Sequence, residues 1–258
     1  MLRPRIIPCL LIQKRGLVKT VYFKSPKYVG DPINAVRIFN EKLADELMVL
    51  DIDCSKNGIE PDYRMIRNLA SECRMPLCYG GGIKTPEQAK KIISLGVEKI
   101  AISSAAIQQP KLIQDVVKEI GSQSLVVVFD VKKKRLTKGY DTLIYNGSLN
   151  TRRSVFELVA EVEKLGAGEI VINSIDRDGA MNGYDIELAK KIMQLVSIPV
   201  TMVGGAGNLD HVGELIQSCG IIGASAGSLF VFKGPYKAVL INYPTITKRD
   251  ELVQKYLL

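Results

Sequence analysis

Two pairs of glycine- and serine-rich turns are the first residues of this sequence that could do chemistry. Glycines let backbone N–H groups approach an anion closely, and serine hydroxyls at the start of a following helix add further donors. The candidate phosphate-binding residues are Gly81, Gly82, Ser103, Ser104, Gly204, Gly205, Gly227 and Ser228. Two such cradles in one chain indicate a ligand with two phosphates. The alternative is that these glycines only make tight turns.

One carboxylate near the middle of the chain is the candidate acid–base group. Asp130 ends the β-rich run VVVFD, and two facing carboxylates would form a natural acid–base pair. When LVVVFDVK is matched with the N-terminal run IIPCLLIQ, Leu11 falls at the equivalent position. An isobutyl group neither donates nor accepts a proton. A second proton transfer would therefore need water or another carboxylate, for which Asp51 is the candidate.

The elements that must position these residues are eight β-rich runs alternating with eight stretches of helical period. The runs begin near residues 5, 46, 76, 99, 124, 168, 198 and 220, and the helical stretches cover 32–43, 60–73, 85–95, 109–119, 152–165, 184–195, 209–217 and 247–257. This alternation implies parallel strands joined by crossover helices. Eight units in 258 residues predict an α/β fold of the (β/α)8 TIM barrel type. An open doubly wound sheet is the alternative, but the first strand lacks its GxGxxG turn.

An internal repeat supports the barrel. DELMVLDID (45–53) matches GEIVINSID (168–176), and AISSAAI (101–107) matches ASAGSLF (224–230), each at a spacing of 123 residues. We therefore predict one domain of two half-barrels, at about 1–122 and 123–258. The Leu11 and Asp130 pair is offset by only 119 residues, from which we expect loop one to be about four residues longer than loop five.

Four charged residues stand at the predicted beginnings of strands, which lie at the other end of the barrel. They are Arg5, Glu46, Lys99 and Glu169. Two residues of each sign could close a salt-bridged ring, which from the residues alone is most simply a stabilising plug.

Composition excludes several classes of function. The apolar runs are too short to span a membrane, and the N-terminus does not read as a signal peptide. Five scattered cysteines predict reduced thiols in the cytoplasm, and a single histidine, His211, argues against a histidine-ligated metal or a nucleophilic triad. We expect neither a metal nor a cofactor. The net charge of +8 is spread along the chain, which favours anionic small molecules or an acidic partner over nucleic acid.

The order of motifs resembles the cyclase subunit of imidazole glycerol phosphate synthase, HisF. RIIPCL, GDPINA, DELMVLDID, YGGGI, KIAISSAAI, FDVK, NSIDRDG and VGGAG follow one another over nearly the whole length. The resemblance implies ammonia supplied by a glutaminase (HisH-like) subunit at the N-terminal barrel face, through a gate formed by Arg5, Glu46, Lys99 and Glu169. It also implies a catalytic aspartate at Asp130 and a lysine, Lys19, on a mobile loop that closes over substrate. The family has a second aspartate where this chain has Leu11, so cyclase activity should be weak.

That departure favours a subgroup of the family. The segments PCLL, RGLVKT and FKSPKYVGDPINAV are similar to the WbuZ paralogues found with surface-polysaccharide genes. This resemblance implies that ammonia passes toward amidation of a sugar, together with an ATP-dependent sugar amidase and a phosphorylated ligand. The alternatives are a histidine-pathway cyclase with a displaced acid group and an unrelated sugar-phosphate isomerase. Around Lys19, the loop is unusually basic and aromatic, so it could either cover an anionic substrate or be an ordinary solvated loop.

Overall fold

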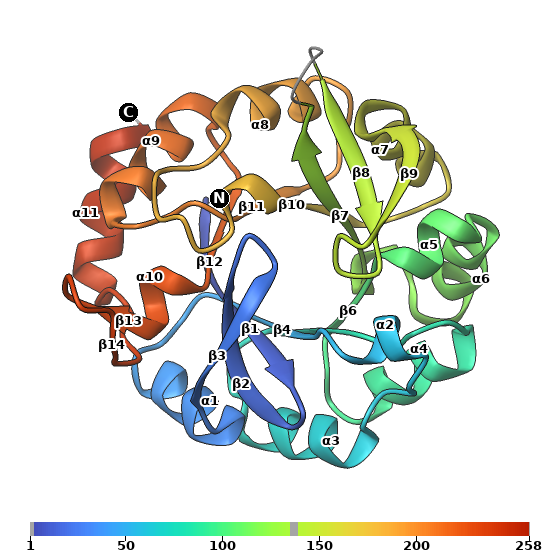
Figure 1. Ribbon diagram of the computed structural model, residues 1–258, viewed down its shortest axis with the longest axis horizontal. Helices are drawn as coiled ribbons and strands as arrows, with labels where there is room; N and C mark the ends of the chain where they lie inside the picture. Colours follow the sequence, from blue (N-terminus) through green and yellow to red (C-terminus); the bar gives the residue numbers. More distant parts are fainter. Residues whose placement is uncertain (1–2, 135–138, 258) are drawn as a thin grey trace.

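The eight β-rich runs form one closed parallel barrel in the computed structural model, which describes residues 3–134 and 139–257 (Figure 1). Its strands are β1 (Arg5–Gln13), β4 (Leu47–Asp51), β5 (Leu77–Gly80), β6 (Lys99–Ile102), β7 (Leu125–Lys133), β10 (Glu169–Ser174), β11 (Val200–Val203) and β12 (Gly223–Ala226). Strand β7 pairs with β10 and β12 pairs with β1, so the ring has no open edge. The predicted (β/α)8 fold is confirmed.

Long helices surround the barrel, as Figure 1 shows. They are α1 (Pro32–Glu41), α3 (Tyr63–Glu72), α4 (Pro86–Ser94), α6 (Lys111–Ile120), α7 (Val155–Lys164), α8 (Ile186–Met193), α9 (Leu209–Cys219) and α11 (Ile246–Leu257). Helix α4 begins where its sequence signals predict, because Thr85 and Gln88 form a capping box and Pro86 occupies the first turn. One predicted boundary is wrong, since residues 152–154 belong to a strand rather than to α7.

Two antiparallel hairpins extend from the barrel and were not predicted. Strand β1 continues into β2 (Gly16–Val21) and β3 (Lys24–Gly30), and β7 continues into β8 (Tyr140–Ile144) and β9 (Leu149–Ser154). Asp130 therefore does not end its strand, because β7 runs on to pair with β8. The shorter elements are α2 (Cys54–Asn57), α5 (Ser104–Gln108), η1 (Ser122–Ser124), η2 (Ile175–Arg177), α10 (Ser228–Val231), β13 (Phe232–Lys233) and β14 (Ala238–Val239).

The expected difference between loops one and five is wrong in direction. From Leu11 to Asp31, which caps α1, the chain advances 20 positions (11 to 31). From Asp130 to Ser154, which precedes α7, it advances 24 (130 to 154). The strand register explains the four extra residues. Leu11 lies beside Leu50, and Asp130 lies beside Asn173, so the offset between the halves grows from 119 to 123 after loop five. This correspondence supports the half-barrel repeat and the single domain, which stay predictions.

Two apolar cores hold the fold together. The larger packs the outer faces of the strands against the helices. The smaller lies inside the barrel and consists of Ile7, Cys9, Met48, Cys78, Ala101, Val126, Val128, Val171 and Val203. Alternate side chains of each strand point to opposite faces, so the short buried strands supply both cores. Side chains thus fill the barrel below its mouth.

Candidate functional site at the barrel mouth

A cavity of about 510 Å³ opens at the C-terminal ends of the barrel strands. This is the end of a (β/α)8 barrel where active sites lie, because the βα loops converge there. All eight residues of the two predicted cradles line the cavity. The sequence therefore placed the cradles correctly at one site, whereas their binding of phosphate stays a prediction.

Four of the five cradle glycines, all except Gly227, occupy conformations that other residues rarely adopt. Gly81 and Gly82 have φ of +130° and +74°, and Gly204 and Gly205 have +97° and +111°. A Cβ atom on Gly205 would lie 2.0 Å from the carbonyl oxygen of Gly183. These turns therefore require glycine for their own geometry. Tight turning and anion binding are compatible, because both bring backbone close to the space that a ligand would occupy.

The two serines of the first cradle differ in their hydrogen bonding. The Ser103 hydroxyl is buried and has no hydrogen-bond partner among the described residues, although it lines the cavity. The Ser104 hydroxyl accepts a hydrogen bond of 2.9 Å from the backbone N–H of Tyr145. Buried polar groups are nearly always satisfied, so the free Ser103 hydroxyl is the side chain of this cradle best placed to meet a ligand.

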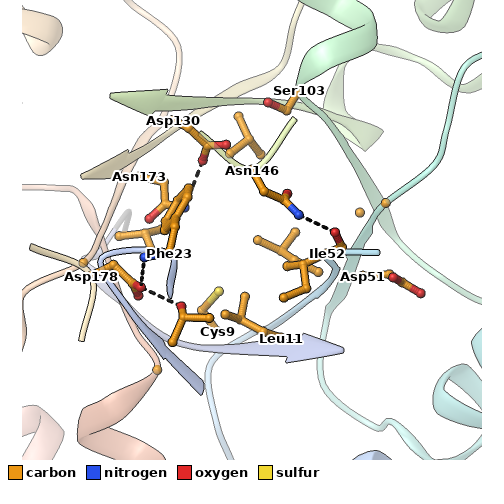
Figure 2. Close-up of a pocket in the computed structure, with 18 of the residues that line it drawn as sticks. Cys9, Leu11, Phe23, Asp51, Ile52, Ser103, Asp130, Asn146, Asn173 and Asp178 are labelled. Atoms are coloured by element: carbon orange, nitrogen blue, oxygen red, sulfur yellow. Dashed lines mark hydrogen bonds between the residues drawn. The ribbon is translucent and has the colours of Figure 1, made fainter. Parts of the chain in front are cut away.

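Asp130 is a buried carboxyl group at the floor of the mouth. Its Oδ1 accepts a hydrogen bond of 3.0 Å from the Asn173 amide (Figure 2). Burial raises the pKa of Asp130 to about 7, the Asn173 hydrogen bond opposes this shift, and the charge of Asp178 adds to it. A group with such a pKa can gain or lose a proton near neutral pH, as a general acid or base must.

The opposite wall of the cavity is apolar. Leu11 and Leu50 stand side by side in adjacent strands, as Asp130 and Asn173 do in the other half of the barrel. Cys9 lies below Leu11, and burial raises the pKa of its thiol to about 12, so it stays protonated. The cavity thus has one hydrogen-bonding wall, at Asp130 and Asn173, and one apolar wall, at Leu11 and Leu50.

Asp51 is the candidate for the missing carboxylate, and its part in proton transfer stays a prediction. It lines the same cavity but lies across it from Asp130 (Figure 2). Its Oδ1 accepts hydrogen bonds from the backbone N–H groups of Asp53, at 3.0 Å, and Cys54, at 3.3 Å. Burial raises the pKa of Asp51, while these hydrogen bonds act to lower it. One oxygen of this carboxylate therefore shapes the turn before α2.

Lys19 lies in a folded hairpin rather than in an open loop. It belongs to β2, and its ammonium group donates across 2.6 Å to Oδ1 of Asp178. Oδ2 of the same carboxylate accepts from the Thr20 hydroxyl at 2.6 Å and from the backbone N–H of Phe23 at 3.1 Å. The tip of the β2–β3 hairpin is thereby fixed over the cavity, and Phe23 contributes to the cavity wall. The alternative of a solvated loop is wrong for Lys19, which is 8% exposed.

The β8–β9 hairpin extends across the mouth from the second half of the barrel toward the first. Its turn residue Asn146 donates through its side chain to the backbone carbonyl of Ile52, in the first half of the barrel. Its neighbour Gly147 touches Phe23, because a Cβ atom placed there would lie 3.3 Å from the phenyl ring. Each hairpin is therefore fastened to the opposite half of the barrel. Sequence analysis missed Asn146, Asn173 and Asp178, although Asn146-Gly147 is a recognisable hairpin signal.

The four predicted gate residues form a closed ring at the N-terminal end of the barrel. Arg5 donates to Glu46 at 2.5 Å and to Glu169 at 2.7 Å, and Lys99 donates to the same two carboxylates at 2.9 Å each. Burial would raise the pKa of Glu169, but the hydrogen bond from Arg5 and the charges of Arg5 and Lys99 hold it below its usual value. Burial likewise acts to lower the pKa of Lys99, yet the two glutamates raise it. The ion pairs thus hold Arg5, Lys99 and Glu169 in their charged forms.

Comparison with known proteins shows the family to which the chain belongs. The model of the histidine biosynthesis protein family matches residues 5–236. The chain belongs to the HisF family. It is 60% identical over 252 residues to a Leptospira borgpetersenii protein provisionally named imidazole glycerol phosphate synthase subunit HisF, covering 98% of this chain and 99% of that protein. A Vibrio vulnificus relative, provisionally named subunit hisF3, is 54% identical over 254 residues, covering 98% of each chain.

A more distant relative is named HisF outright rather than provisionally. Imidazole glycerol phosphate synthase subunit HisF of Clostridium botulinum is 40% identical over 233 residues, covering 90% of this chain and 92% of its own. The resemblance to HisF is therefore confirmed, whereas the WbuZ subgroup stays a prediction. Within residues 3–134 and 139–257, no helix has the length and apolar character needed to cross a membrane.

Proposed function

We propose that this HisF-family barrel is the ammonia-accepting subunit of a glutamine amidotransferase complex that amidates a sugar. A complete charged ring at one end of the barrel, combined with one carboxyl group where an acid–base pair would need two, carries the proposal. Ammonia from a glutaminase subunit would enter through the ring of Arg5, Glu46, Lys99 and Glu169 and leave at the cavity. The apolar wall at Leu11 removes the second proton-transfer group that cyclisation would use.

The face around the ring offers a surface on which a glutaminase could dock. Leu43, Leu195 and Ile221 are 59%, 46% and 51% exposed, and each lies in a connection from a helix to the next barrel strand. These connections belong to the N-terminal face of the barrel. A glutaminase docked on this face would cover these apolar side chains, as interfaces do.

Features of the cavity support the proposal that the acceptor is phosphorylated. The two glycine turns and the free Ser103 hydroxyl would hold phosphate, and Lys19 passes within contact of the second cradle, because a Cβ atom on Gly227 would lie 2.9 Å from its Cε. A separate ATP-dependent sugar amidase would activate the sugar, and the whole assembly would work in the cytoplasm without a cofactor in this subunit. The acceptor and the amidase rest on the resemblance to the WbuZ paralogues.

The second candidate function is the cyclase step of histidine biosynthesis. The names of the relatives favour it, and Asp130, Lys19 and the charged ring are all present. Leu11 opposes it, because a general acid or base contributes about 10²–10⁴-fold to a rate. A cyclase that lacks one of its two groups would be slow unless another residue compensated, and one oxygen of Asp51 accepts backbone hydrogen bonds.

Two measurements separate the candidates. Affinity purification of the native protein should recover both a glutaminase and an ATP-using sugar amidase. Purified protein should turn over the ribulosyl formimino nucleotide with ammonium salt far below about 1 s⁻¹, the low end of ordinary enzyme rates. A rate at or above that value would overturn the proposal and establish the cyclase.

A further inference from the structure

Two segments beside the cavity, which the proposed function leaves unused, form a ridge. We call it the rim ridge and define it as residues 24–28 of β3 together with residues 232–240, which contain β13 and β14. The two segments touch, because the ammonium group of Lys27 lies 5.6 Å from the centre of the Phe232 ring. Figure 1 shows β3 over the barrel mouth and β13 and β14 at the adjoining edge.

The rim ridge is strongly basic. Lys24, Lys27, Lys233 and Lys237 are all exposed, and no aspartate or glutamate occurs in residues 22–30 or 229–245. Within residues 3–134 and 139–257, none of these four lysines has a carboxylate within 4.0 Å, unlike Lys19 or Lys99. A local excess of four positive charges attracts an acidic surface and speeds its association.

The rim ridge also exposes large apolar side chains. Tyr28 is 66% exposed and Tyr236 is 94% exposed, while Val239 and Leu240 are 46% and 49% exposed. The β13–β14 hairpin has only two paired positions, so its backbone gives these side chains little cover. Tyrosines and aliphatic side chains between lysines resemble the centre and the rim of a protein–protein interface.

The rim ridge lies directly beside the cavity and shares residues with its wall. Lys24, Ser25 and Pro26 belong to the ridge and also line the cavity. The β13–β14 hairpin follows α10 directly, and α10 begins at Ser228 of the second cradle. A body seated on the ridge therefore lies beside the opening through which an acceptor must enter and product must leave.

We infer that the rim ridge docks the acidic face of the enzyme that consumes the ammonia, so that this enzyme closes the barrel mouth. The inference rests on the proposed function, because that function requires such a partner. Burial of Tyr236, Val239 and Leu240 would supply the apolar centre, and the lysines would surround it. A protein fits better than a nucleic acid, because the ridge contains no arginine and places aliphatic side chains at its centre.

The test compares binding of the purified sugar amidase to matched variants of the full-length protein. Tyr236→Ala removes the most exposed tyrosine, and the pair Lys233→Glu and Lys237→Glu reverses two charges. The control reverses two exposed lysines of helix α8, Lys190→Glu and Lys191→Glu, which lie outside the ridge. Circular dichroism and thermal unfolding establish that each variant is folded before binding is measured.

We expect the Tyr236 variant to bind about 30-fold more weakly, which corresponds to a residue worth about 2 kcal/mol. The charge-reversed pair should slow association and flatten its dependence on salt, because these charges steer the encounter. The α8 control should bind as the wild type does. The glutaminase should bind all variants equally, because it would dock at the opposite end of the barrel.

Three outcomes would overturn the inference. Equal binding of the amidase to all variants would place its interface elsewhere and leave the proposed function standing. Lysine-dependent binding to phosphatidylserine vesicles or to duplex DNA, without amidase binding, would assign the ridge to a different occupant. Failure to find any amidase in the native complex would refute the proposed function itself, and the docking inference with it.

Discussion

Lys19 and Asp178 are 159 residues apart in the chain, yet the Lys19 ammonium group donates to the Asp178 carboxylate across 2.6 Å. This contact fastens the β2–β3 hairpin of the first half to the loop after β10 in the second. Asn146 of the β8–β9 hairpin makes the reciprocal contact with Ile52. Two straps thus cross the mouth, each extending from one half of the barrel to the other.

Asp178→Asn should release the first strap. The amide cannot neutralise Lys19, and removing one partner of a buried ion pair typically costs about 3–5 kcal/mol. Lys19 can reach water if the hairpin swings outward, so opening of the hairpin relieves the unpaired charge. We expect amide hydrogen exchange to become about 100-fold faster in residues 16–30 while the barrel strands stay protected.

The control for this prediction is Asp141→Asn in the other hairpin. Asp141 lies 3.7 Å from Lys134 in a pair that is 43% and 30% exposed, and such pairs contribute little. Its hairpin should exchange as in the wild type. Unchanged exchange in residues 16–30 of the Asp178 variant would show that the strap is held by other contacts.

Asp130 should make the stability of the protein depend on pH. Its folded pKa of about 7 lies above the ordinary value of 3.8, so between these values the folded state keeps a proton that the unfolded state has released. The stabilisation from this group is therefore complete below pH 3.8 and is lost as pH rises toward 7. Between these pH values, the contribution of Asp130 to the free energy of unfolding falls by up to about 1.4 kcal/mol per pH unit.

Chemical denaturation of the wild type and of Asp130→Asn from pH 4 to pH 8 measures this contribution. The asparagine cannot ionise, so the difference in unfolding free energy, wild type minus variant, should fall through the window and level off above pH 7. A difference that stays constant with pH would show that Asp130 is ionised throughout.

Leu11→Asp tests how much of the cyclase chemistry is missing. The substitution places a second carboxylate on the apolar wall beside Leu50, where it would face the same ligand as Asp130. We expect cyclase turnover with ammonium salt to rise by about 10²-fold, at the lower end for one acid–base group, because the hairpin that carries Lys19 also departs from the family. Leu11→Asn, which has the same shape but no acid–base group, should give no rise. Full recovery of an ordinary enzyme rate would show that Leu11 alone separates this chain from a cyclase.

The sequence predicted the barrel well because alternation and repetition act over the whole chain. Eight runs and eight helical stretches leave few ways to pack, so each barrel strand and outer helix was found. The hairpins were missed because β2, β3, β8 and β9 occupy segments that a simple strand–helix alternation reads as loops. Asp178 could not be recognised as the partner of Lys19, because its role depends on a hairpin that bends across the mouth from the other half. Leu11 was found because its significance lies in residue type and position alone.

Ser225 tests whether the barrel interior holds a small polar molecule. Ser225 lies two residues after Gly223 in β12, so both lie on the same face of the strand. Gly223 packs against Thr201, which donates to Glu169 of the charged ring, because a Cβ atom on Gly223 would collide with Thr201. The Ser225 hydroxyl is buried and, in the part of the chain that the structure describes, has no hydrogen-bond partner. If the interior is dry, Ser225→Ala should stabilise the protein by about 1 kcal/mol, because it removes an unsatisfied polar group. Denaturation by urea gives this value, and a loss of stability would reveal a bound water or ammonia at the hydroxyl.

Lys99→Ala and Glu46→Ala distinguish a gate from a plug. Both substitutions break the ring, and Lys99→Ala leaves Glu46 and Glu169 with Arg5 alone. Either change should lower the free energy of unfolding, since one partner of a partly buried pair is lost. A gate predicts a further effect, which is fewer amide nitrogens transferred to product for each glutamine hydrolysed by the assembled complex. Glutamine labelled with nitrogen-15 at its side-chain amide measures this ratio. The glutamate formed counts the glutamine hydrolysed, and the labelled product counts the nitrogen transferred. Arg37→Ala breaks an exposed pair with Glu72 and serves as the control, for which neither quantity should change appreciably. If the ring variants lose stability but keep the wild-type ratio, the ring is a structural plug and ammonia does not pass through it.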